Sequence, residues 1–182
     1  MKQPNIKQVS NNKEKGNTYK RIIEKYNVAI EAGYYGEAEL IVYAFMEDRL
    51  RAMLYHLGAI DRRTNKNIND DAIQIIGKKK CINDISAKRE VIIELMRIEN
   101  LEKINNEYSK FLKMVFEKYV KRNELKSLLK KVEEWCSYRN ELVHGLFNKD
   151  IEDLHSGLAT HVNQGYKMAR EIDCYVSKIK SI

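Results

Sequence analysis

Proline and glycine are scarce in this chain, which has one proline (Pro4) and eight glycines among its 182 residues. This scarcity excludes proline-rich linkers, collagen-like repeats and the turn-dense sequences of most β-sandwiches. No apolar run approaches the roughly 20 residues of a membrane span. The polar first 20 residues also lack the apolar segment of a secretory signal. The sequence therefore predicts a protein that contacts no membrane and stays in the cytoplasm.

Cysteine is also rare, and the three cysteines (Cys81, Cys136 and Cys174) are far apart and form no C-x-x-C pair. This spacing argues against a disulfide framework and against a zinc site built from thiolates. We expect free thiols that pack as small hydrophobic side chains. No metal ion or other cofactor is expected.

Positive charge is what the chain has in excess. The 33 Lys and Arg residues outnumber the 26 Asp and Glu residues, which gives a formal charge of +7 and a pI near 9.2. A net positive field raises the rate of encounter with polyanions and favours nucleic acid as a partner. Because acidic residues are interspersed, many of these cations are expected to line solvated helix faces, so charge alone leaves nucleic-acid binding open.

The hydrophobic pattern indicates an all-α protein. Apolar residues recur at steps of three and four within stretches rich in Glu, Lys, Leu and Ile. Residues 1–16 are predicted to form a polar, flexible arm, and residues 17–182 a single helical domain. The expected helices cover residues 18–32, 35–58, 86–104, 107–120, 123–144 and 150–179, with a short apolar segment at 72–81. They predict a bundle of four principal helices plus one or two short ones, with Thr18 capping the first and the helix over 35–58 central.

The stretch YRNELVHG, residues 138–145, places an arginine, an amide, a carboxylate and a histidine close together. It lies where the helix over 123–144 ends at Gly145, since glycine readily takes the left-handed conformation of a helix end. The apolar stripe of that helix, continued from Leu125 and Leu128, reaches Arg139. An arginine in this register is costly to bury unless it meets a carboxylate, a phosphate or a second subunit.

Arg139 and His144 together suit the cleavage of an RNA phosphodiester without a metal ion. The imidazole can exchange a proton with a 2′-hydroxyl or with the departing 5′-oxygen, and the guanidinium can hold the phosphate in a fork. Asn140, four residues before His144, can orient the ring or contact the substrate. Because such chemistry normally uses two proton-transfer groups, a motif with one histidine per chain predicts a site shared by two chains across a two-fold axis.

RNELVHG, residues 139–145, resembles the Arg-x4-6-His motif of the HEPN superfamily, in the form with a polar residue after the arginine and a glycine after the histidine. The resemblance implies a helical homodimer whose two motifs face each other in a cleft. It also implies a metal-independent endoribonuclease of microbial (antiviral) defence or of a toxin–antitoxin system, with Arg139 and His144 catalytic and Asn140 supportive. RNA is the implied substrate, and an antitoxin or other regulatory protein a further partner.

The sequence departs from one toxin subfamily of this superfamily. That subfamily carries a tyrosine two residues after the histidine, which its antitoxin modifies. Leu146 occupies that position here, so that antitoxin mechanism is not expected.

An acidic residue on an early helix often approaches the arginine in this superfamily. The segment YAFMEDRLRAML offers Glu47 and Asp48, and the resemblance favours Glu47 as the residue that orients Arg139. The alternative is that both carboxylates are solvated and pair with Arg49 or Arg51 on the same helix.

Other polar groups have simpler explanations beside functional ones. Lys78, Lys79 and Lys80 in GKKK are candidates for contacts with an RNA backbone, with a solvated loop as the bland alternative. His56 and His161 are expected to be structural or surface residues.

Two Glu-x-x-His pairs, Glu141/His144 and Glu152/His155, raise the alternative of a di-iron site. They are only eleven residues apart and lie on either side of Gly145, whereas that architecture needs them on separately placed helices, so no metal site is predicted. Two other functions stay open. One is a catalytically inactive HEPN-like module that binds RNA or a protein and dimerises, and the other is a helical adaptor in which Arg139 forms a buried salt bridge.

Overall fold

The computed structural model describes residues 12–144 and 151–182. Within these ranges the chain forms helices and no strand, apart from one isolated β-bridge between Asn67 and Cys81. The helices are α1 (Asn12–Glu31), α2 (Tyr35–His56), α3 (Asp70–Ile76), α4 (Ile85–Leu95), α5 (Ile98–Glu102), α6 (Glu107–Met114), the π-helical turn η1 (Val115–Tyr119), α7 (Arg122–His144) and α8 (Ile151–Lys180). The all-α prediction is confirmed. In the described part of the chain, no helix is both long enough and apolar enough to cross a membrane.

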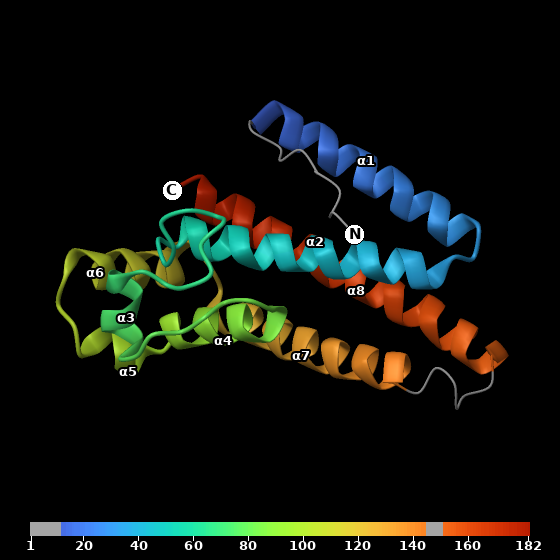
Figure 1. Ribbon diagram of the computed structural model, residues 1–182. Coiled ribbons are helices and arrows are strands. Elements are labelled where there is room, and N and C mark those ends of the chain that lie inside the picture. Colours follow the sequence, from blue (N-terminus) through green and yellow to red (C-terminus); the bar gives the residue numbers. More distant parts are fainter. Residues whose placement is uncertain (1–11, 145–150) are drawn as a thin grey trace, which may run out of the picture.

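Helix α2 lies in the middle of the bundle (Figure 1). It packs along α8 over most of its length, with α1 and α4 against its other sides, while α7 packs on α8 and α4. The short helices α3, α5 and α6 gather at one end (Figure 1). Ten residues of α2 are buried, including Val42, Leu50 and Met53. The predicted central place of this helix is therefore confirmed.

Helix α1 begins earlier than its sequence predicts. Residues 12–16, assigned to a flexible arm, belong to the helix, whereas residues 1–11 lie outside the described residues. Thr18 is inside α1 and does not cap it, because its hydroxyl donates to the Glu14 carbonyl 2.9 Å away, one turn back. A threonine within a helix commonly satisfies its hydroxyl in this way.

The chain also has more short helices than the one or two predicted. The single helix expected over 86–104 is two helices, α4 and α5, because Arg97 between them has an extended conformation. The Asn100 side chain stabilises this break by donating to the Glu94 carbonyl at 3.1 Å. The helix expected over 107–120 is α6 followed by the π-helical turn.

The three cysteines are free thiols, as predicted. The expectation that they pack as small hydrophobic side chains is wrong for Cys81 and Cys174, which are exposed. Cys81 lies in the loop before α4, and Cys174 lies on the solvent face of α8. Cys136 on α7 is half-buried, and burial raises the pKa of its thiol to about 11.

Helices α7 and α8 are joined by an aromatic contact. The Trp135 ring stacks on His161 with centroids 4.7 Å apart, and its Nε1 donates to the His161 carbonyl at 2.9 Å. His161 is only 4% exposed, and its Nε2 lies 3.3 Å from Oε1 of the buried Glu39. His161 is therefore a core histidine, one of the roles predicted for it. Gly165 makes room for the indole, since a Cβ there would lie 2.6 Å from the Trp135 ring.

Two glycines of α8 are expected to respond oppositely to substitution by alanine. Gly165→Ala should lower the free energy of unfolding by about 2 kcal/mol, because the new methyl group must displace a buried, hydrogen-bonded ring. Gly157→Ala should raise it by up to about 1 kcal/mol through helix propensity, since among the described side chains its Cβ would meet the Tyr138 hydroxyl alone, at an ordinary contact distance of 3.4 Å. Urea denaturation of both variants measures the two changes, and destabilisation of equal size in both would contradict the packing argument.

Candidate functional site

Helix α7 carries the Arg-x4-His motif in its last turns and follows its predicted register. The apolar stripe is buried as far as the final turns, at Leu125, Leu128, Leu129, Val132 and Trp135. Arg139 continues this stripe and is half-buried. The sequence therefore predicted correctly that Arg139 turns toward the body of the protein.

The Arg139 guanidinium rests on an aromatic ring of α2. Its Cζ lies 4.6 Å from the centroid of Tyr43, a cation–π contact. Nη1 donates a long hydrogen bond of 3.4 Å to Asn140 Oδ1, and the buried Nε has no hydrogen-bond partner. The Tyr43 ring and the Asn140 amide therefore hold the guanidinium in place, while its Nε–H donor remains without a hydrogen bond.

Two other buried guanidinium groups, those of Arg49 and Arg89, have carboxylate partners. A buried Nε without a hydrogen bond occurs at four described arginines: Arg49, Arg89, Arg122 and Arg139. Arg49 pairs with Asp173 at 2.8 Å, and Arg89 with Glu133 at 2.6 Å. In the described part of the chain, neither Arg122 nor Arg139 has a carboxylate within ion-pair distance. Both lie on α7, so this helix carries two half-buried cations able to accept an anion from outside the chain.

Glu47, predicted to orient Arg139, lies one turn after Tyr43 on α2. It forms ion pairs with two other cationic side chains. Its Oε1 accepts from Lys88 Nζ at 2.9 Å and lies 3.7 Å from Arg51 Nη2. No ion pair among the described residues joins it to Arg139. The alternative predicted from the sequence, pairing within the same helix, is present for Glu47 with Arg51 and for Asp48 with Arg49.

Lys88 is the residue near this site that sequence reasoning missed. Its side chain is fully buried, and its ammonium group donates to Glu47 and to the Asp84 carbonyl at 3.1 Å. Burial lowers the pKa of Lys88, and the hydrogen bond with Glu47 opposes this shift. Because Lys88 and Arg51 balance the charge of Glu47, no ion pair among the described residues compensates the positive charge of Arg139. The position of Lys88 in the helical register indicates its burial, since Lys88 falls between the buried Ile85 and Ile92.

The remaining motif residues lie at the outer end of α7. Asn140 is exposed, and the described part of α7 reaches His144. The side chain of His144 and the whole of Gly145 lie outside the described residues, as do the side chains of Glu152 and His155. The structure thus places Arg139 and Asn140 in contact and leaves the position of the imidazole as a prediction.

The GKKK lysines follow α3, at the opposite end of the bundle from the end of α7 (Figure 1). Lys78 and Lys79 are exposed. Lys80 is half-buried and donates to Glu90 at 2.9 Å. The structure does not bring these three residues together with Arg139, and Lys80 is already paired within the chain.

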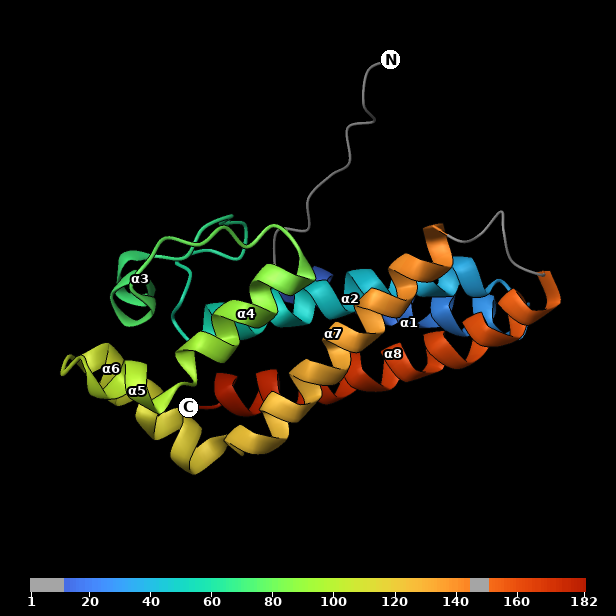
Figure 2. The same cartoon turned by 90° about the horizontal axis from the view of Figure 1, so that it is seen from below.

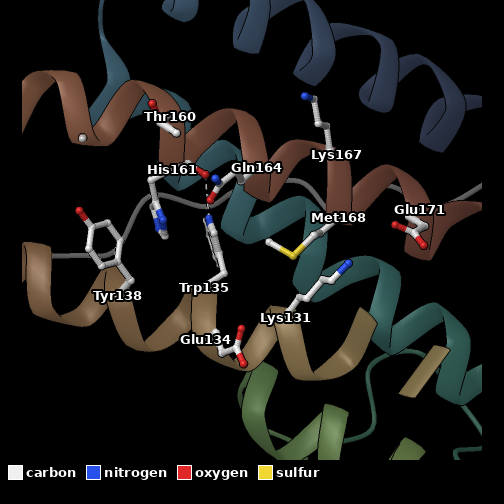
Figure 3. A pocket seen from close by; sticks show the side chains of 11 residues that line it. Lys131, Glu134, Trp135, Tyr138, Thr160, His161, Gln164, Lys167, Met168 and Glu171 are labelled. Carbon is white, nitrogen blue, oxygen red and sulfur yellow. Dashed lines mark hydrogen bonds between the residues drawn. The ribbon is translucent and has the colours of Figure 1, made fainter. Parts of the chain in front are cut away.

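A groove of about 780 Å³ lies between α7 and α8, next to the motif (Figure 3). Trp135, Tyr138 and Met168 contribute apolar surface to it. Its charged lining residues are balanced, with Lys131 and Lys167 against Glu134 and Glu171. A balanced lining of this kind suits another protein surface better than a polyanion.

Comparison of the chain with protein-family models, with curated proteins and with solved structures finds no match. Among the side chains that the structure describes, no group of three or more His, Cys, Asp or Glu residues is placed to hold a metal ion. The resemblance to the HEPN superfamily therefore rests on the motif and on its place in a helical bundle.

Proposed function

We propose that the protein is a metal-independent endoribonuclease of the HEPN type that acts in microbial defence or as a toxin. The observation that supports this most is the state of Arg139. It is half-buried in the core register of α7, rests on Tyr43, and has no carboxylate partner among the described residues. A guanidinium in this state is suited to bind a phosphate through its planar fork of N–H donors.

In the proposed reaction, Arg139 holds the non-bridging oxygens of the scissile phosphate and stabilises the charge that develops on them. The 2′-oxygen attacks phosphorus and the bond to the 5′-oxygen breaks, which yields a 2′,3′-cyclic phosphate and a 5′-hydroxyl. One imidazole accepts the 2′-hydroxyl proton, and a second donates a proton to the 5′-oxygen. His144 is proposed for both roles, once from each of two chains.

This need for two imidazoles makes a homodimer part of the proposal. The groove between α7 and α8 supports it, because the groove adjoins the motif and combines apolar surface with equal numbers of Lys and Glu residues. A two-fold axis requires such a self-complementary surface. The proposal also includes an antitoxin or other regulatory protein, for which we assign no binding surface.

Incubation with single-stranded RNA in EDTA tests the proposal. We expect cleavage of the RNA at a rate that EDTA does not reduce, and no cleavage of the same RNA with 2′-O-methyl groups, because its 2′-oxygens cannot attack. Binding of both RNAs without cleavage would instead favour an inactive RNA-binding dimerisation module. Cleavage that requires added Mg²⁺ would contradict the proposed mechanism.

A further inference from the structure

A second arginine-lined site lies at the other end of α7. A pocket of about 210 Å³ forms where the first turn of α7 meets the connection between α4 and α5. Its polar lining residues are Arg97, Glu99, Arg122, Asn123 and Lys126, and its apolar ones are Ile93, Met96 and Ile98. We call it the Arg122 pocket.

The charge of the Arg122 pocket is mainly positive. Three of its described lining residues are cationic, and one, Glu99, is acidic. Arg122 has a buried Nε without a hydrogen bond, and its Cζ lies 5.9 Å from the Phe116 ring. Arg97 forms an ion pair with Glu94 at 3.2 Å, whereas neither Arg122 nor Lys126 forms an ion pair within the described ranges. The amino end of α7, whose dipole favours an anion, adds to this field.

The Arg122 pocket and Arg139 lie near opposite ends of α7. Arg139 follows Arg122 by 17 residues, so the two side chains leave the helix about 26 Å apart along its axis and about 100° apart around it. Helix α4 runs antiparallel beside α7, since Arg89 pairs with Glu133 and Arg97 lines the same pocket as Arg122. The end of α7 extends past the start of α4 (Figure 2).

We propose that the Arg122 pocket binds a backbone phosphate of the RNA strand whose scissile phosphate lies at Arg139. This inference rests on the proposed function and adds an RNA contact remote from the reacting atoms. A stacked strand rises roughly 3.4 Å per nucleotide along its axis, so about eight stacked nucleotides, or fewer extended ones, span the two sites. The site would secure the strand without reading its sequence, as phosphate contacts do.

Binding of a 12-nucleotide 2′-O-methyl RNA, followed by fluorescence anisotropy over a series of KCl concentrations, tests this inference. Arg122→Gln and Lys126→Gln should each weaken binding about 5- to 10-fold in low salt. Each should also make the plot of log K against log salt less steep by about 0.7, the value for one lost phosphate contact on a single strand. Lys130→Gln is the matched control, because this exposed lysine lies one turn further along α7, 3.8 Å from Glu134 and outside the pocket.

The possible outcomes test phosphate binding by the Arg122 pocket separately from the proposed ribonuclease activity. Weaker binding by Arg122→Gln and Lys126→Gln would support the pocket even if the wild type cleaves no RNA, which would contradict the proposed function alone. Equal binding by Lys126→Gln and Lys130→Gln, together with cleavage by the wild type, would contradict the pocket alone. Absence of RNA binding by the wild type would contradict both. Because Lys126 is exposed, its substitution keeps the test independent of folding.

Discussion

Replacing Arg139 by alanine is expected to lower the rate of RNA cleavage about 100- to 1,000-fold, the usual effect of removing one group that stabilises developing charge. The fold should survive, because Arg139 has no carboxylate partner among the described residues that its loss would leave unpaired. Loss of the contact with Tyr43 should lower the free energy of unfolding by about 1 kcal/mol or less. Single-turnover rates at saturating RNA, with urea denaturation of the same samples, measure both quantities.

Two further variants identify what Arg139 contributes. Arg139→Lys keeps the charge but loses the planar fork, and we expect a rate between those of the wild type and Arg139→Ala. Arg170→Ala removes the same charge from an exposed position on α8 and should cleave at the wild-type rate. If Arg139→Ala and Arg170→Ala cleave equally well, Arg139 has no role in the reaction.

His144→Ala should have an effect at least as large, about 100- to 10,000-fold on the cleavage rate, as expected for loss of a general acid or base. Binding of the 2′-O-methyl RNA should change little, because phosphate contacts dominate affinity for nucleic acid. The readout is therefore a cleavage rate that falls while the dissociation constant stays constant.

His56→Ala is the control for loss of a histidine. His56 is half-buried at the end of α2, and its Nε2 lies 3.2 Å from Arg63 Nη2. This variant should cleave RNA at the wild-type rate. Full activity of His144→Ala in EDTA would show that the enzymatic proposal is wrong.

The long helices could be predicted from the sequence because each buries one continuous apolar stripe. Such a stripe fixes both the extent of α7 and the inward register of Arg139, whatever the partner helices are. The errors arose at the ends of helices, where the apolar stripe gives no sharp signal. The break between α4 and α5 is stabilised by a hydrogen bond from Asn100, and Thr18, expected as a cap, lies inside α1 and bonds back to Glu14.

The surroundings of Arg139 could be predicted only in part. The sequence offered two acidic residues on α2, but only the tertiary packing of α4 on α2 shows that buried Lys88 holds Glu47. The register rule that identifies Arg139 also places Lys88 and Arg122 on inward-facing stripes, since Lys88 is buried and Arg122 half-buried. It identifies polar side chains that turn inward, whereas their partners depend on how the helices pack.

The chemical identity of the cleaved RNA ends tests the central claim most directly, that the end of α7 handles the scissile phosphate while the 2′-hydroxyl of the RNA attacks it. Mass spectrometry of fragments made by the wild type in EDTA gives these ends. We predict a 2′,3′-cyclic phosphate on one fragment and a 5′-hydroxyl on the other. Fragments with a 3′-hydroxyl and a 5′-phosphate would contradict the account, because water and not the 2′-oxygen would then be the nucleophile.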